Sequence, residues 1–429
     1  MRWGGGAGRP QRRGRRHSCG RHRAGRCCAV GAMPRSPEPC WVPEDGGRAG
    51  GEHGAMRIHD HAAGALGQPD LIDLGEGLYV LRFESMKVAS AEGAVRSVLR
   101  DGKVRPGGTV VDSSSGIYAH ALALACHRHG LRCHIVGSTT VDPTLVAQLR
   151  LLGATVERMP SSDSLRLDQH RRVGRIQRLL AENPGWYWMQ QYHCSRHYEG
   201  YRPLGDATYT ALADAGHGER IRLVAAVGSG ASSAGLGEGM RAAGADVEIV
   251  GVQPFGSVTF GSADVPDPDM LIAGIGSSIE FRNVRPEIFA AIHWVSFEVA
   301  RAGARDALRQ HGLFAGLSTG ACWAVARYEH GGHRGRDGDD GRGSDSGLGS
   351  DSRLGSRRGI QDGDRREGKD SRRATVFVAP DTGHRYLHSV FEGPDSQLGD
   401  LQPSCVDEGG GGLPELPWSM TRHPERWAG

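Results

Sequence analysis

Short apolar runs alternate with segments of helical periodicity through the middle of the chain. Apolar residues recur every three or four positions over 89–100, which predicts a helix, whereas the run 109–112 is typical of a short buried strand. By the same criteria, we expect further strands within 70–81, 131–136, 154–159, 222–227, 247–252 and 375–379. Further helices are expected from 116 onward and over 142–153, 164–181, 235–243, 304–311 and 319–328.

These repeated strand–helix units predict an α/β fold with a parallel sheet that is covered by helices on both faces. In such a sheet, ligands bind at the carboxyl ends of the strands. Two strand-to-helix turns there are rich in serine and glycine: 113–116 reads Ser-Ser-Ser-Gly, and 228–232 reads Gly-Ser-Gly-Ala-Ser. Such turns offer free backbone N–H groups beside a helix dipole, so each is either an anion site or an ordinary connection.

Three segments depart from this pattern. Residues 1–62 are rich in arginine and glycine, and 331–373 mix glycine, aspartate, arginine and serine with few apolar residues. Such compositions cannot bury enough apolar surface to offset the entropy of ordering, so we expect both to be disordered and 396–429 to be a flexible tail. An alternative for the first segment is that translation starts at Met33 or Met56.

One lysine stands out in a chain that uses arginine for almost all of its positive charge. Of 52 lysines and arginines, only Lys87, Lys103 and Lys369 are lysines. An arginine is a permanent cation, whereas a buried lysine can lose its proton and act as a nucleophilic amine. Lys87 comes soon after the apolar run 78–81, where a strand would end. Two roles are therefore open for it: a Schiff-base lysine for pyridoxal phosphate, or a solvated loop lysine.

Composition also argues against several classes of function. A net charge of +3 is too small to indicate a nucleic-acid partner, and no apolar run approaches the ~20 residues needed to span a bilayer. Nine cysteines without regular spacing favour a reducing cytoplasm over a disulfide framework. His193, His197 and Tyr198 are too loosely spaced to predict a metal site.

Four separated motifs, taken in order, resemble those of the cysteine synthase and cystathionine β-synthase family of pyridoxal-phosphate enzymes. They are Ser85-Met86-Lys87, Ser114-Ser115-Gly116-Ile117, Gly228-Ser229-Gly230-Ala231-Ser232 and Ala315-Gly316-Leu317-Ser318-Thr319-Gly320. Weaker similarities follow at 190–192, 251–254, 274–276 and 380–387. The resemblance implies a two-lobed fold-type II enzyme made of parallel-sheet αβα domains, with the active site between them. Its core would comprise 63–330 and 374–395, with a smaller lobe over roughly 100–200.

The resemblance also implies a role for each motif. Lys87 would be the catalytic residue and would carry pyridoxal 5′-phosphate. The other cofactor-binding positions would be Gly228, Ser229, Gly230, Ala231 and Ser232 at the phosphate, Ser318 at the pyridine nitrogen and Ile117 beside the ring. The substrate carboxylate would be bound by Ser114, Ser115, Gly116, Tyr118 and Gln191. The resemblance implies no metal. It does imply a homodimer that acts on a small amino acid.

The implied reaction is β-elimination from an O-acetylserine or O-phosphoserine type of substrate to an aminoacrylate, followed by addition of a nucleophile. Where the family has an asparagine that donates to the cofactor's phenolic oxygen, this sequence has Ile117. Tyr118 is either a substitute donor or a packed aromatic residue. The serine-rich turn also resembles relatives that use an amine nucleophile to make diaminopropionate-type amino acids. A cofactor-binding pseudoenzyme is the remaining alternative.

Overall fold

The computed structural model describes residues 57–139, 141–162, 165–262, 272, 274–277, 279–331, 373–392, 396–399, 401–407 and 413–427. The disorder expected for 1–62 and 331–373 therefore concerns mostly residues outside the described part, namely 1–56 and 332–372. Within that part, no helix combines the length and apolarity required to cross a membrane.

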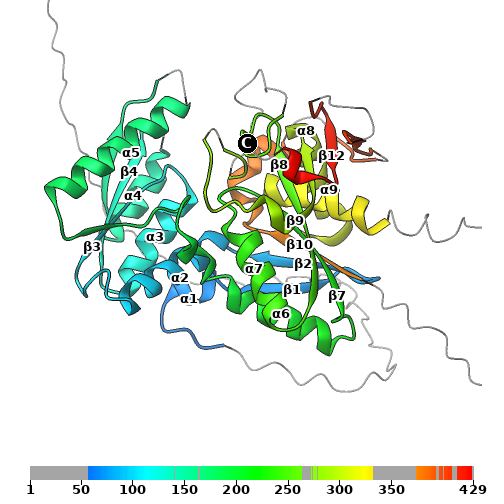
Figure 1. Ribbon diagram of the computed structural model, residues 1–429, viewed down its shortest axis with the longest axis horizontal. Helices are drawn as coiled ribbons and strands as arrows, with labels where there is room; N and C mark the ends of the chain where they lie inside the picture. The colour runs from blue at the N-terminus through cyan, green and yellow to red at the C-terminus, as the bar shows by residue number, and fades with distance from the viewer. Residues whose placement is uncertain are drawn as a thin grey trace, which may run out of the picture. The chain divides into compact units, whose positions relative to one another are not determined.

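The described chain contains two sheets, and the larger one has eight strands (Figure 1). Its strand order is β1-β2-β10-β7-β8-β9-β12-β11. Pairing is parallel from β2 through β9, whereas β1 and β12 run antiparallel to their neighbours β2 and β9. In chain order the strands are β1 (Pro69–Asp73), β2 (Leu78–Phe83), β7 (Arg220–Ala226), β8 (Asp246–Pro254), β9 (Phe289–Val295), β10 (Ala374–Ala379), β11 (Ser404–Cys405) and β12 (Trp418–Thr421).

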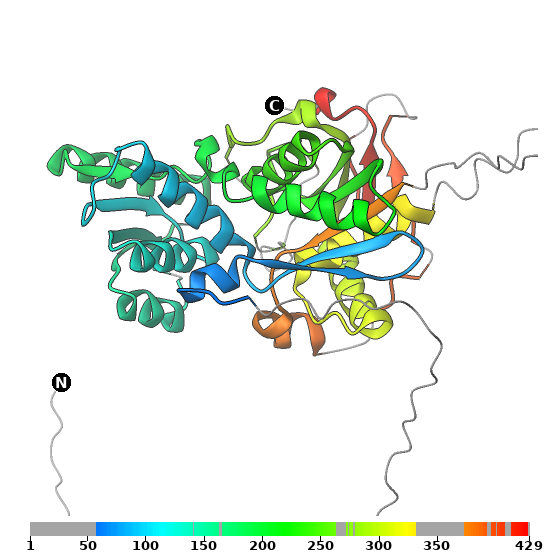
Figure 2. The same ribbon diagram turned by 90° about the horizontal axis from the view of Figure 1, so that it is seen from below.

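Helices cover both faces of this sheet, as the alternation of strands and helices predicts. The apolar residues of α6 (Arg202–Asp214) and α7 (Ala231–Ala242) pack on one face. Those of α8 (Phe297–His311) and α9 (Leu317–Gly331) pack on the other. Figure 2 shows the two helix pairs, green and yellow, on opposite sides of the blue hairpin formed by β1 and β2.

A second sheet has four parallel strands in the order β5-β4-β3-β6 and lies within 109–188. Its strands are β3 (Thr109–Ser113), β4 (Arg132–Ser138), β5 (Thr155–Met159) and β6 (Trp186–Trp188). The helices that accompany it are α2 (Met86–Arg100), α3 (Ile117–Arg128), α4 (Pro143–Leu151) and α5 (Leu165–Glu182). Short α1 (Ala62–Leu66) packs near the start of α2. Asp142 caps α4 by accepting a hydrogen bond from the Thr144 N–H, as expected for a helix whose first residue is proline.

Three parts of the sequence interpretation need correction. The segment 70–81 forms an antiparallel hairpin and not one strand, because Gly75, Glu76 and Gly77 all take positive φ and reverse the chain. The sequence analysis does not predict strands β6 and β9 or helix α6, although the apolar run of β9 is of the kind that indicates a buried strand. Finally, 396–429 contains β12, whose residue Trp418 is 2% exposed, so this strand is part of the sheet and not of a flexible tail.

Candidate active site

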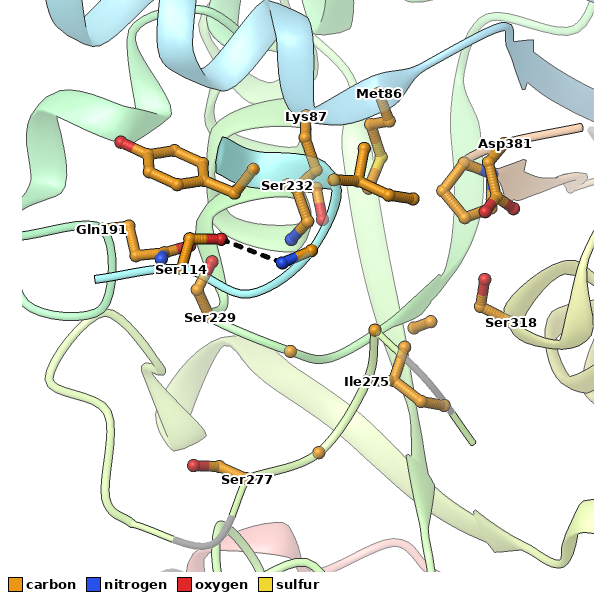
Figure 3. Close-up of a pocket in the computed structure, with 18 of the residues that line it drawn as sticks. Met86, Lys87, Ser114, Gln191, Ser229, Ser232, Ile275, Ser277, Ser318 and Asp381 are labelled. Atoms are coloured by element: carbon orange, nitrogen blue, oxygen red, sulfur yellow. Dashed lines mark hydrogen bonds between the residues drawn. The ribbon is translucent and has the colours of Figure 1, made fainter. Parts of the chain in front are cut away.

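A cavity of about 470 Å³ is lined by residues that follow the carboxyl ends of β3, β7 and β10, together with the first turns of α2 and α9. The predicted site residues that line it are Lys87, Ser114, Ser115, Gly116, Ile117, Tyr118, Gln191, Gly228, Ser229, Ser232 and Ser318. In Figure 3, Lys87 points into the pocket, Ser114, Gln191 and Ser229 lie on one side of it, and Ser318 and Asp381 lie on the other.

Lys87 is the second residue of α2, directly after the end of β2. The helix start is fixed to the core because the Met86 N–H donates to the Pro380 carbonyl at 2.9 Å. The amine of Lys87 makes no hydrogen bond or ion pair with any residue that the structure describes. Burial lowers its pKa below the usual lysine value, and the nearby charge of Asp381 opposes that shift. Lys87 is therefore more easily deprotonated than an exposed lysine.

Asp112, at the end of β3, organises the turn 113–116. One carboxylate oxygen accepts from the Ser113 N–H at 2.8 Å, and the other accepts from the Gln191 N–H at 3.0 Å. Burial raises the pKa of Asp112 to about 6. Gln191 in turn donates one amide hydrogen to the Ser113 carbonyl at 2.7 Å, which leaves its second amide hydrogen for another acceptor. Asp112 thus connects the start of the turn 113–116 to Gln191.

The serine hydroxyls of this turn also serve the backbone. Ser114 Oγ accepts from the N–H groups of Gly116 at 3.4 Å and Ala119 at 3.1 Å, as a helix-capping side chain does. Ser115 Oγ accepts from the Ser138 N–H at 2.9 Å. Each hydroxyl keeps its own hydrogen, so both can still donate to an anion in the cavity.

Tyr118 does not supply the donor that was lost with the family asparagine. Its hydroxyl lies 2.7 Å from His197 Nε2, while His197 Nδ1 lies 3.0 Å from the Cys194 carbonyl. Because a carbonyl only accepts, Nδ1 carries the hydrogen and Nε2 accepts the hydroxyl hydrogen of Tyr118. Burial lowers the pKa of His197 to about 4, so the imidazole is neutral. Ile117 remains an apolar residue of the lining without a substitute donor from Tyr118.

The turn 228–232 joins β7 to α7. Gly230 has a φ of 79°, and a Cβ there would lie 2.4 Å from the Asn283 carbonyl oxygen, so only glycine fits. Two predicted members of the site, Gly230 and Ala231, do not line the cavity. Their side-chain positions are packed against other parts of the protein, so they shape the turn while Gly228, Ser229 and Ser232 face the space.

Ser318 enters the cavity from the first turn of α9, where its side chain is 4% exposed. The approach of this helix is close: a Cβ at Gly316 would lie 2.3 Å from the Tyr386 ring and 2.7 Å from Asp381 Oδ1. Because residue 316 is a glycine, the segment after β10, which contains Asp381 and Tyr386, can reach the cavity.

Sequence reasoning missed several residues of the lining. Gln169 and Arg172 lie three residues apart on α5 and both face the cavity, and Arg172 Nε donates to Ser113 Oγ at 3.1 Å. Tyr192 and Phe281 form a stacked pair, with ring centroids 4.1 Å apart and planes at 4°. The regular spacing on α5 was available in the sequence, whereas nothing local indicated a pair that is 89 positions apart.

Asp381, Arg385 and Tyr386 also line the cavity. The motif 380–387 that contains them was noticed in the sequence, but no role was given to its side chains. As for metals, the described residues contain no group of three histidine, cysteine, aspartate or glutamate side chains that could hold an ion.

Comparison with known proteins identifies a family and several relatives. The family of pyridoxal-phosphate dependent enzymes matches residues 79–338. An N-(2-amino-2-carboxyethyl)-L-glutamate synthase from Ralstonia nicotianae is 34% identical over 242 residues, which cover 55% of this chain and 68% of the relative. A putative cysteine synthase from Sinorhizobium fredii is 32% identical over 185 residues, covering 42% of this chain and 53% of the relative.

Solved structures agree on the fold. The cysteine synthase of Entamoeba histolytica superposes with a TM-score of 0.63 at 18% identity, covering 82% of this chain and 97% of that one. An O-ureido-L-serine synthase superposes with a TM-score of 0.57 at 21% identity, covering 79% of this chain and 97% of that one. These likenesses confirm the predicted fold class.

Proposed function

The chain belongs to the pyridoxal-phosphate dependent enzymes, and on that premise we propose that it catalyses β-replacement on an activated serine. In this reaction the substituent on the serine β-carbon leaves and a nucleophile takes its place. One observation carries the proposal: the desolvated amine of Lys87 lies in the same cavity as the turns 113–116 and 228–232. An amine, an amino-acid carboxylate and a cofactor phosphate are the groups that such a cavity can accommodate together.

The residues present fit the cofactor. Lys87 has a free amine for its aldehyde. The phosphate would be held at the start of α7, where the helix dipole favours an anion, by Ser229, Ser232 and the backbone at Gly228. A Cβ at Gly228 would lie 2.9 Å from the Gly274 carbonyl oxygen, so glycine permits this tight turn. When bound, the cofactor supplies an electron sink for the pair released at the substrate Cα.

The side chains of the protein then have separate tasks. Lys87 would act as the base that takes the proton from Cα. Ser114, Ser115 and Gln191 would donate to the substrate carboxylate and so orient that Cα toward the amine. Ser318 is uncharged and would not keep a proton on the ring nitrogen, and a weaker electron sink favours the loss of a β-substituent.

The charge of the cavity favours an anionic second substrate. Among the described residues, two permanently cationic side chains, Arg172 and Arg385, line it against one acidic side chain, Asp381. An acidic amino acid that reacts through its amine would meet this excess of positive charge with its carboxylates. The relative from Ralstonia is named for a product of this kind, a substituted glutamate. We therefore propose an amine nucleophile, and sulfide is the second candidate because other relatives are cysteine synthases.

The proposal is tested with the purified full-length chain. O-acetylserine and O-phosphoserine are each supplied with glutamate or with sulfide, and products are identified by mass spectrometry. An N-linked product supports the amine nucleophile, and cysteine supports sulfide. A visible absorbance band that does not shift with any amino acid, together with no product, would favour the pseudoenzyme, the alternative suggested by Ile117 in place of the family asparagine. Lys87→Ala should abolish the band and the product, whereas exposed Lys103→Ala should change neither.

Two parts of the proposal concern the setting of the enzyme. A small amino acid is the expected partner, and the homodimer and the cytoplasmic location remain predictions. Sedimentation velocity of the full chain, whose mass is 45.9 kDa, distinguishes a dimer from a monomer.

A further inference from the structure

Asp381 places a carboxylate near Lys87, and it is the acidic side chain that lines the cavity in the described part of the chain. It lies two residues after β10 and is 7% exposed. Tyr386 donates to its Oδ2 at 2.8 Å. Its other oxygen, Oδ1, is buried and has no hydrogen-bond partner among the described residues. A buried carboxylate oxygen without a partner is costly, so a cation or a donor is expected to meet it during function.

The backbone holds Asp381 close to the lysine. Asp381 forms an antiparallel bridge with Ser85, and the Met86 N–H donates to the Pro380 carbonyl at 2.9 Å. The segment after β10 is thereby fastened to the two residues that precede Lys87. The two side chains make no direct ion pair in the described structure, and their charges act on each other through space.

The electrostatics of the two groups are reciprocal. Burial raises the pKa of Asp381 to about 6, while the Tyr386 hydrogen bond and the charges of Arg385 and Lys87 oppose the rise. Burial lowers the pKa of Lys87, and the charge of Asp381 opposes that shift. The other titratable group near the amine is His197, which is neutral and whose pKa the lysine charge lowers further. Asp381 is therefore the group whose charge favours the ammonium form of Lys87.

We propose that Asp381 is a positioning residue that stabilises the proton on Lys87 Nζ, and that Tyr386 holds its carboxylate for this task. The inference rests on the proposed function and deepens it. When Lys87 takes the Cα proton, the electron pair of the C–H bond stays on carbon and the Nζ lone pair binds the proton. The amine becomes an ammonium ion, whose charge the Asp381 carboxylate stabilises. Without that carboxylate, Lys87 would be a weaker base.

The first test measures the amine directly and requires no turnover. The full-length chain, freed of bound cofactor, is labelled with limiting acetic anhydride between pH 6 and 10.5, and acetylation of Lys87 is quantified by peptide mass spectrometry. Exposed Lys103 is the internal reference. Asp381→Asn should move the midpoint of Lys87 labelling down by about one pH unit and leave that of Lys103 unchanged. An unchanged Lys87 midpoint in a folded variant would overturn the inference.

A second variant and a control make the result specific. Tyr386→Phe removes the donor that favours the carboxylate, so the pKa of Asp381 rises and Lys87 loses part of the attraction near neutral pH. We expect a smaller shift of the Lys87 midpoint in the same direction, and this variant carries the test if Asp381→Asn does not fold. The matched control is Asp306→Asn on α8, whose carboxylate accepts from Trp323 and Arg327 outside the cavity lining. It should leave Lys87 unchanged.

Turnover supplies an independent readout. With an accepted serine derivative, Asp381→Asn should lower kcat about tenfold and leave KM within about twofold, because the carboxylate acts on the base and not on substrate binding. A change in KM alone would contradict the assignment. If the labelling midpoint shifts but no serine derivative reacts even in the native protein, the proposed function fails while the link between Asp381 and Lys87 stands.

Discussion

Glu329 on α9 is the centre of a buried charged network that attaches the C-terminal strand, and neutralising it has a calculable effect. One carboxylate oxygen accepts from His293 Nε2 at 3.0 Å and from an Arg422 nitrogen at 2.7 Å, and the other lies 3.4 Å from Arg222. The Glu329 side chain is 1% exposed and that of Arg222 is 2% exposed. Glu329→Gln would leave the buried arginine without one of its two carboxylate partners, although Glu248 remains 3.3 Å away.

The magnitude follows from the acidity of the carboxyl group. Burial alone would raise its pKa, but the His293 hydrogen bond and the charges of Arg422 and Arg222 lower it from 4.5 to about 2. A difference of about 2.5 pH units, at ~1.4 kcal/mol each, corresponds to about 3 kcal/mol of stability at pH 7. Since the folded pKa is the lower one, this contribution is complete above pH 4.5 and is lost as the pH falls toward 2.

Denaturant unfolding followed by tryptophan fluorescence measures the effect. Trp418, one of eight tryptophans, belongs to this network because its indole N–H donates to His293 Nδ1 at 3.1 Å. We expect Glu329→Gln to lower the free energy of unfolding by about 3 kcal/mol at pH 7 and by about 2 kcal/mol at pH 3.5. The matched control is Glu298→Gln, which breaks a pair between the exposed Glu298 and the half-buried Arg301 and should cost less than ~1 kcal/mol. A loss that is equal for both variants, or independent of pH, would refute the reasoning.

Three further predictions concern the cavity and its surroundings. Gly230→Ala places a Cβ 2.4 Å from the Asn283 oxygen at a positive φ, so affinity for pyridoxal phosphate should fall at least tenfold in an absorbance titration. Tyr118→Phe leaves His197 Nε2 buried without its donor, and urea unfolding should show a loss of about 1–2 kcal/mol. Asp142→Ala removes the cap of α4 and should cost about 1 kcal/mol by the same measurement, with a loss below 0.3 kcal/mol counting against the cap.

The parts of the site that the sequence could predict are those whose chemistry is local. Lys87 stands out because lysine is rare in this chain, and the turns 113–116 and 228–232 each combine serine and glycine between a strand and a helix. Lys87 and the turn 228–232 follow parallel strands of the eight-stranded sheet, and the turn 113–116 follows a strand of the four-stranded sheet. The cavity is lined from the carboxyl ends of both sets of strands. Local composition was sufficient in these places, since each turn is built by consecutive residues.

The remaining features depend on contacts between distant segments. The hydroxyl of Tyr118 is 79 positions from the imidazole that accepts from it, so its availability as a donor could not be judged from neighbouring residues. Similarly, β12 follows a segment rich in glycine and proline, and only the buried contacts of Trp418 with the sheet distinguish it from a flexible tail. Asp381 acquires its proposed role through a strand that pairs with β2 and β7, both far upstream.

The position of β10 also has a consequence for synthesis on the ribosome. Although β10 lies between β2 and β7 inside the sheet, it is encoded after residue 373, so nascent chains can form β1-β2 and β7-β8-β9 only as separate pieces. The two pieces can join only after β10 has been translated. Joining strands across so many residues is an intrinsically slow step. Cofactor capture should therefore follow the translation of β10, and chains that stop within 332–372 should emerge with an open sheet.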